Sequence, residues 1–283
     1  MMLQKNPTAV LVAMFMVLIV GAPPHSAISE TIAPHLDAQG RAGYEEFLNS
    51  PPHSAFVIAP GGTWSWVSGM ASQLQAEESA LDACATNTEQ TCHLFSVDGQ
   101  TVFNTDAWKS SWVLGADSTL HDGTSVGTKK GMAFPDLALN APDGTKVSLK
   151  DFRSNVVFLH FWGSWCPPCQ SEFPDLQTLY NMMAKENVVK FVLVQAREPI
   201  ERSRAWAKRK EITMPLFDSG HQGRSDEEFK LSDASAVANR LLASAYPSTY
   251  VLDKKGRVVF HKSGAGHNWI EYADLLRELS KAN

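Results

Sequence analysis

The chain carries one pair of cysteines at a spacing that suits thiol-disulfide exchange. The stretch FLHFWGSWCPPCQSEFP, residues 158–174, holds Cys166 and Cys169 with two prolines between them. The apolar run before the pair predicts a buried strand, and the residues after it predict a helix that begins at the cysteines. Backbone N–H groups and the dipole at a helix N-terminus favour a negative sulfur, so Cys166 is expected to ionise near neutral pH.

The positions of the two cysteines predict a separate step of thiol-disulfide exchange for each of them. Cys166 is expected to attack a disulfide, and Cys169 is expected to resolve the mixed disulfide that forms. Pro167 and Pro168 cost no hydrogen bond at the first helical positions and stiffen the ring that the disulfide closes. A permanently closed disulfide and half of a zinc site are the alternatives. Zinc needs two further ligands, and no second Cys-x-x-Cys or His-x-x-x-His pair is present.

The elements that must position this pair alternate between strand and helix. Apolar runs at 155–162 and 191–196 predict buried strands, and helical patterns follow them and close the chain. Glycine turns predict a hairpin around Asp143-Gly144 and an antiparallel pair around Lys255-Gly256. This order predicts an α/β fold with a central mixed sheet flanked by helices. The polar addition between Asp218 and Ala243 is interpreted as a rim loop.

A smaller α+β domain is expected before this one. Residues 28–114 contain two predicted hairpins and a helix, residues 115–131 are rich in Gly, Ser, Thr and Asp as a linker would be, and residues 132–283 hold the cysteine pair. Cys84 and Cys92 stand at the predicted helix end and strand start, where a bond between them would stabilise the domain by roughly 2–3 kcal/mol. A second redox pair is the less favoured interpretation.

Composition and the N-terminal residues limit the cellular compartment and the kinds of partner that the sequence predicts. The 283 residues carry a formal charge of −5 with no basic stripe, which argues against nucleic acid as a partner. An apolar run of about fourteen residues, Ala9 to Ala22, follows Lys5 and is shorter than the roughly twenty residues that span a bilayer. Residues 1–27 therefore predict a signal peptide and export to the periplasm or beyond, with an uncleaved membrane anchor as the alternative.

The second part resembles the TlpA/ResA-like branch of the thioredoxin superfamily, the exported thiol-disulfide oxidoreductases. The resemblance covers about residues 131–281. It rests on five features: FPDLAL, GTKVSLKDF, FWGSWCPPC, the residues Glu172 and Pro174, and YPSTYVLDKKGRVV. It implies a thioredoxin-like fold and a protein thiol-disulfide oxidoreductase that needs no cofactor.

The resemblance also implies roles for particular residues. Pro247 corresponds to the family's cis-proline facing the disulfide, and Tyr246 would offer backbone groups to a substrate peptide, with simple packing as its alternative role. Trp165 would lie beside the exposed sulfur and shape the docking surface. Glu172 corresponds to a partly buried acid that passes a proton to or from Cys169. The alternative is a solvated helix glutamate.

His160 departs from the family pattern. By its distance from the first cysteine it occupies a strand position that is aspartate in thioredoxin and commonly asparagine in this branch. A functional His160 would exchange a proton with Cys169 or lower a thiolate pKa, and its titration near 6.5 would make activity depend on pH. The favoured interpretation is a buried neutral imidazole hydrogen-bonded to backbone.

The resemblance favours a reductase over an oxidant. Its expected substrates are exported proteins with disulfides or thiols, such as apocytochrome c or copper-site cysteines, and its expected electron donor is a membrane thiol-disulfide protein. A Cu(I)-binding metallochaperone is the alternative, with Cys166, Cys169 and either His261 or His267 as ligands. No metal site is predicted. A thiol peroxidase is the lesser alternative, because Gly163 stands where that class needs Thr or Ser.

Overall fold

The computed structural model describes residues 33–112 and 125–282. The described residues from Ala33 onwards belong to one compact unit. The predicted signal peptide and residues 115–124 of the predicted linker lie outside the described residues, so the proposed domain boundaries stay a prediction. Across the described ranges, no helix is both long enough and apolar enough to cross a membrane.

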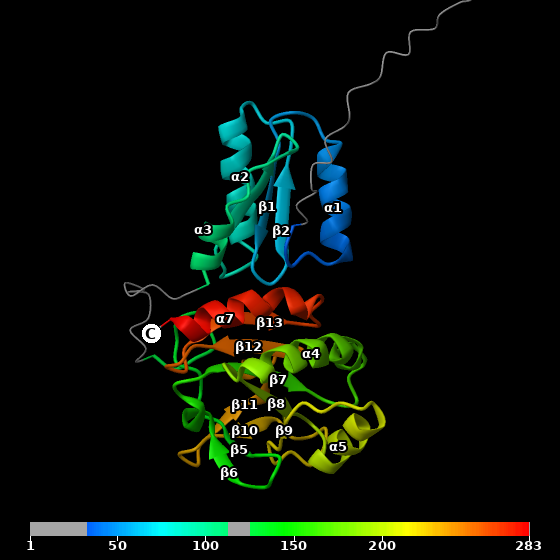
Figure 1. Cartoon of the computed structure of the whole chain (residues 1–283), viewed down its shortest axis with the longest axis vertical. Coiled ribbons are helices and arrows are strands. Elements are labelled where there is room, and N and C mark those ends of the chain that lie inside the picture. The colour runs from blue at the N-terminus through cyan, green and yellow to red at the C-terminus, as the bar shows by residue number, and fades with distance from the viewer. Residues whose placement is uncertain (1–32, 113–124, 283) are drawn as a thin grey trace, which may run out of the picture. The chain divides into compact units, whose positions relative to one another are not determined.

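The N-terminal part is a four-stranded antiparallel sheet with helices on both faces (Figure 1). Its strands follow the order β2-β1-β3-β4. Its elements are α1 (Ala38–Leu48), β1 (Ala55–Ala59), β2 (Thr63–Val67), α2 (Gln73–Ala85), β3 (His93–Val97), β4 (Gln100–Thr101) and α3 (Thr105–Ser110). Alternate residues of β1 face α2 and α1, which explains why all five of them are buried.

Both predicted hairpins of this part are confirmed. Gly61 and Gly62 turn between β1 and β2 with φ of 93° and 87°, and Asp98 and Gly99 turn between β3 and β4 with φ of 47° and 75°. Such positive φ values cost glycine little, and aspartate tolerates them better than most residues. The predicted Cys84–Cys92 disulfide is also present, at the end of α2.

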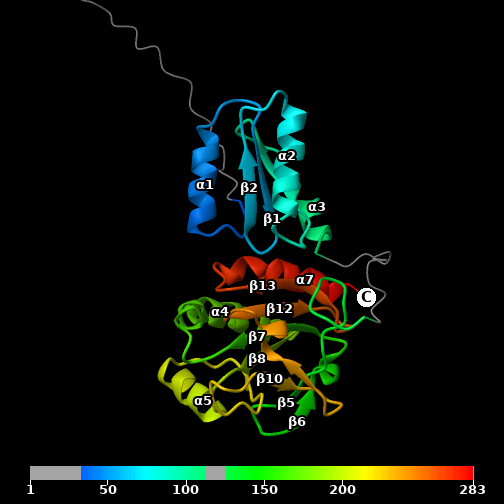
Figure 2. The same cartoon turned by 180° about the vertical axis from the view of Figure 1, so that it is seen from behind.

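The second sheet has five strands in the order β13-β12-β7-β8-β9 (Figure 2). Strands β7, β8 and β9 are parallel, and β12 and β13 run antiparallel to their neighbours. The strands and their helices are β7 (Val156–Trp162), α4 (Pro167–Glu186), β8 (Val189–Gln195), α5 (Ile200–Arg209), β9 (Leu216–Phe217), β12 (Ser248–Leu252), β13 (Val258–Ser263) and α7 (Ala273–Lys281). This mixed sheet with flanking helices is the predicted thioredoxin-like fold.

Three shorter groups of elements complete this part. They are the predicted hairpin of β5 (Ala138–Asn140) and β6 (Lys146–Ser148), the 3-10 turns η1 (Leu149–Phe152) and η2 (Trp269–Tyr272), and the segment with β10 (Glu228–Lys230), β11 (Ala236–Ala238) and α6 (Asn239–Leu242). The interpretation of that last segment as a rim loop was wrong. Phe229 in β10 is buried and lies 5.2 Å from the Phe161 ring, so one apolar side chain anchors a hairpin within a polar stretch.

One hydrophobic core extends through both parts. It contains Phe47 and Trp112 from the N-terminal part together with Phe260 and Tyr272 from the second. The buried ring of His35 stacks on Tyr272 with 4.0 Å between centroids. Both views show β13 and α7 next to the N-terminal elements. The N-terminal part is therefore packed against the edge of the five-stranded sheet through aromatic contacts.

Replacing Cys84 and Cys92 together by alanine should lower the free energy of unfolding by about 2–3 kcal/mol, because the bond closes a loop between residues eight apart in sequence. Urea unfolding measures this loss. The background should be Cys166→Ala/Cys169→Ala, in which Cys84–Cys92 is the remaining disulfide. In that background, unchanged stability on removal of the bond would contradict the expectation.

Candidate active site

The cysteine pair lies where β7 passes into α4. Cys166 is the N-cap residue of α4, and Pro167 and Pro168 are exposed in its first turn, as predicted. The two sulfurs form a disulfide. The backbone N–H of Cys169 donates to Cys166 Sγ at 3.2 Å. In the reduced protein this N–H and the helix dipole would stabilise a Cys166 thiolate.

The Tyr246–Pro247 peptide bond is cis, as the resemblance implied, and lies against the disulfide. The carbonyl oxygen of Tyr246 is 3.5 Å from Cys166 Sγ. Trp165 packs edge-on against Tyr246 at 5.4 Å and its Nε1 donates to the carbonyl of Ala196 at 2.9 Å. The residues expected to form a substrate groove thus lie together around Cys166.

Glu172 lies one helical turn beyond Cys169, on the same side of α4. It is only 3% exposed, so the interpretation as a solvated helix glutamate was wrong. Its Oε2 accepts hydrogen bonds from the N–H of Gly266 at 2.7 Å and from Nε1 of Trp269 at 3.0 Å. Burial raises the pKa of Glu172 to about 8 despite these two donors, because desolvation disfavours the carboxylate.

His160 of β7 is completely buried, with its ring 6.0 Å from that of Phe173 on α4. Its Nδ1 lies 2.9 Å from Thr249 Oγ1, and its Nε2 lies 3.4 Å from Glu172 Oε1. Burial lowers the pKa of His160 to about 3. A neutral imidazole beside a protonated carboxyl is not an ion pair, and neither His160 Nε2 nor Glu172 Oε1 has a hydrogen-bond partner among the described residues. The favoured buried neutral form agrees with this geometry, although the partner is a hydroxyl rather than backbone.

Sequence reasoning missed the residue that holds the loop before Cys166. Glu198, three residues after the carboxyl end of β8, is buried and accepts hydrogen bonds from the N–H and the Oγ of Ser164, each at 2.6 Å. Its Oε1 also accepts from Ser203 Oγ at 2.6 Å. An acidic residue at the end of a parallel strand was the available signal, because such strand ends meet at the site edge.

Arg197 was missed as well. Its guanidinium lies 5.7 Å from the centre of the Tyr246 ring, within the range of a cation–π contact. The hydroxyl of Tyr246 donates to Asn239 Oδ1, and burial raises the pKa of Tyr246 to about 12. The rim next to Cys166 therefore presents a neutral phenol ring with a cation over it.

The residues of the alternative functions do not gather at the cysteine pair. Within residues 33–112 and 125–282, no three His, Cys, Asp or Glu side chains form a group that could hold a metal. His261 instead stacks on Tyr250 with 4.2 Å between centroids. A Cβ on Gly163 would lie 2.2 Å from Trp165 Nε1, so the tryptophan occupies the space that the side chain of a peroxidase Thr or Ser would need.

Replacing Glu172 by glutamine should stabilise the protein more at high pH than at low pH. The native pKa of about 8 exceeds the ordinary value of 4.5, so the stability contributed by protonated Glu172 is present below pH 4.5 and is lost as the pH rises through 8. The difference in unfolding free energy between variant and wild type should grow by on the order of 2–4 kcal/mol from pH 5 to pH 9. Denaturant unfolding at both pH values measures it, and a difference that does not change with pH would contradict a buried, protonated Glu172.

Comparison with known proteins places this site in a family. The Redoxin family matches residues 129–276. The thioredoxin-like protein YneN of Bacillus subtilis is 32% identical over 132 residues, which is 46% of this chain and 69% of that protein. The thiol-disulfide oxidoreductase ResA of Geobacillus thermodenitrificans is 32% identical over 128 residues, 45% of this chain and 66% of that protein.

Among solved structures, a putative thiol:disulfide interchange protein DsbE from Chlorobium tepidum aligns with 54% of this chain and 99% of its own, at 22% identity and a TM-score of 0.43. The Redoxin match spans more than half of the 283 residues and includes the disulfide, Glu172 and the cis-proline. The chain therefore belongs to the Redoxin family and is a thiol-disulfide oxidoreductase.

Proposed function

We propose that this protein is an exported reductase that opens disulfides in other exported proteins. The observation that carries the proposal is the pairing of a helix-capping Cys166 with a buried acid, Glu172, next to the resolving Cys169. The first favours a nucleophilic thiolate, and the second provides a place for the proton that Cys169 must lose. Export is supported by the apolar run from Ala9 to Ala22 after Lys5.

The first step is attack by the Cys166 thiolate on a substrate disulfide. A bond forms between Cys166 Sγ and one substrate sulfur, the substrate S–S bond breaks, and the other substrate sulfur leaves as a thiolate that takes a proton from solvent. The carbonyl of Tyr246, 3.5 Å from Cys166 Sγ, is placed to accept a hydrogen bond from an extended substrate backbone. Trp165 and Tyr246 border that backbone.

The second step transfers the proton of Cys169. The Cys169 thiol gives its proton to the Glu172 carboxylate, and its sulfur attacks Cys166 Sγ. A Cys166–Cys169 bond forms, the bond between Cys166 and the substrate sulfur breaks, and that substrate sulfur leaves as a thiolate that takes a proton from solvent. Two electrons have then passed from the cysteine pair to the substrate. The products are a substrate dithiol and the Cys166–Cys169 disulfide seen in the structure, above an acid that burial keeps protonated.

Regeneration requires an external dithiol, and a membrane thiol-disulfide protein is the donor we propose. Apocytochrome c and proteins with copper-site cysteines are the proposed substrates, which follows from the resemblance of the second part to ResA-type proteins. The exposed Pro167 and Pro168 form part of the rim that such substrates would meet.

Replacing Cys169 by serine should trap a mixed disulfide between Cys166 and a substrate, because no resolving thiol remains. Incubating the reduced variant with an exported protein that has a single disulfide, followed by non-reducing electrophoresis, tests this. The Cys166→Ser variant is the matched control and should form no adduct. An adduct of equal yield in both variants would exclude Cys166 as the attacking residue.

The reduction potential decides the direction of electron flow. A reductase should have a potential nearer to the roughly −270 mV of thioredoxin than to the roughly −120 mV of the oxidant DsbA. Equilibration of the wild-type protein with glutathione buffers, read by thiol alkylation, measures it. A potential near that of DsbA would contradict the reductase and favour an oxidant with the same site.

The pH dependence of exchange should report Glu172 and not His160. Burial holds the pKa of His160 at about 3, so no step near pH 6.5 is expected from the imidazole, while Glu172 titrates near 8. We therefore expect His160→Asn to retain a step near pH 8 and Glu172→Gln to lose it, in single-turnover rates of disulfide reduction between pH 5 and pH 9. A wild-type step near pH 6.5 that His160→Asn removes would favour a titrating imidazole instead.

A further inference from the structure

A row of polar side chains crosses the sheet beneath the active site. Thr249 of β12 pairs in register with His160 of β7 on one side and with Lys262 of β13 on the other. Residues paired in this way point to the same face of a sheet, so the three side chains share the face on which His160 meets Glu172. The row thus leads from the active-site acid to Lys262 on the edge strand.

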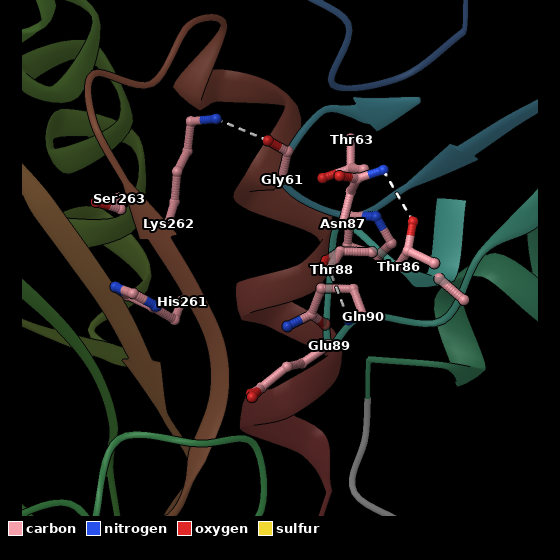
Figure 3. Close-up of a pocket in the computed structure, with 12 residues that line it drawn as sticks. Gly61, Thr63, Thr86, Asn87, Thr88, Glu89, Gln90, His261, Lys262 and Ser263 are labelled. Atoms are coloured by element: carbon pink, nitrogen blue, oxygen red, sulfur yellow. Dashed lines mark hydrogen bonds between the residues drawn. The ribbon is translucent and has the colours of Figure 1, made fainter. Parts of the chain in front are cut away.

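The N-terminal part holds the far end of this row. Lys262 Nζ donates a hydrogen bond of 2.7 Å to the carbonyl oxygen of Gly61, in the turn between β1 and β2 (Figure 3). Lys262 also lines a cavity of about 610 Å³ that is bounded by this turn, by residues 85–90 and by β13. The Gly61 carbonyl in the N-terminal part therefore fixes the position of the Lys262 ammonium in the second part.

The position of that turn is set by close packing. Gly61 has a φ of 93°, and a Cβ there would lie 2.8 Å from the Phe260 ring. The Gly61 N–H also lies 3.4 Å from Nδ1 of His35, whose backbone N–H donates to Glu271. The carbonyl that accepts from Lys262 is thus anchored to the second part on both sides.

Charged groups around Glu172 affect the balance between its carboxyl and carboxylate forms, and Lys262 is one of these groups. His160 is neutral, Asp175 on α4 adds negative charge, and Lys262 on β13 supplies positive charge that favours the Glu172 carboxylate. Burial lowers the pKa of Lys262, and the negative charges of Asp37 and Glu172 act against that lowering. A positive charge in a partly buried setting acts over several ångströms with little screening by solvent.

We propose that Lys262 is a positioning residue for thiol exchange: the N-terminal hairpin fixes its ammonium so that Glu172 keeps a carboxylate population able to take the Cys169 proton. The role of that proton rests on the function proposed above. The effect of Lys262 on Glu172 does not, because it concerns the ionisation of one side chain. The N-terminal part thereby contributes to the active site without touching the cysteines.

The decisive experiment follows the ionisation of Glu172 directly. The infrared band of its protonated carboxyl, identified by its loss in Glu172→Gln, is titrated in the oxidised full-length protein. Lys262→Met should move the midpoint up by roughly 0.5–1 pH unit, since a nearby positive charge is lost. Lys262→Gln, which keeps a donor for the Gly61 carbonyl but has no charge, should shift it similarly and serves if the methionine variant fails to fold.

Two matched controls separate charge from packing. Lys262→Arg keeps the charge and should leave the midpoint within about 0.2 units of wild type, by the same electrostatic argument. Lys255→Met removes a charge from the exposed turn between β12 and β13 and should leave it unchanged. A folded Lys262→Met or Lys262→Gln protein with the wild-type midpoint would overturn the proposal, as would an equal shift in Lys255→Met.

A double-variant cycle tests whether Lys262 acts through Glu172. Lys262→Met should move the pH profile of disulfide reduction upward in the wild-type background and have no effect on it in Glu172→Gln. A shift of the same size in both backgrounds would overturn the proposal. Should the protein prove not to be a reductase, the infrared titration still decides whether Lys262 tunes Glu172, so the two failures are distinguishable.

Discussion

The cost of burying the Glu172 carboxyl is the constraint on which the active site depends. An acid that is 3% exposed must remain protonated or be surrounded by donors and positive charge, and here all three occur. The Gly266 N–H and the Trp269 indole donate to one oxygen, and the other oxygen faces His160. The start of α4, the loop after β13 and strand β7 are therefore fixed relative to one another by a single side chain.

This arrangement explains why the N-terminal part and the redox part share a core. The loop after β13 contacts Glu172 through Gly266, and the turn that follows contacts the N-terminal part through Glu271 and Tyr272. The segment from Gly266 to Tyr272 thus contacts Glu172 near one end and the N-terminal part near the other. The same short segment therefore connects the N-terminal part with a donor to Glu172.

Local patterns in the sequence predicted the strands β7, β8, β12 and β13, the glycine turns and the cysteine-bearing helix, because each depends on residues within a few positions of one another. The continuous apolar run of β7 and the prolines after Cys166 are examples. The contacts of Thr249, Glu198 and Lys262 could not be predicted in this way. Their partners lie 34 to 201 residues away in the chain and are brought together by strand register and packing. Phe229 was missed because a single apolar residue between polar ones carries too weak a period to indicate a hairpin.

The protonation of Glu172 is consistent with the redox state in which the site is seen. In the exchange proposed above, Cys169 loses a proton when the pair is oxidised, and an acid whose pKa burial raises to about 8 would retain that proton at neutral pH. When the pair is reduced again, the sulfur of Cys169 leaves as a thiolate in an apolar setting and needs a proton back. Neutral His160, with its Nδ1 held by Thr249, keeps Nε2 available to accept a hydrogen bond from the protonated carboxyl. Under the proposed mechanism the acid would thus hold the proton between the two half-reactions without placing an uncompensated charge in the core.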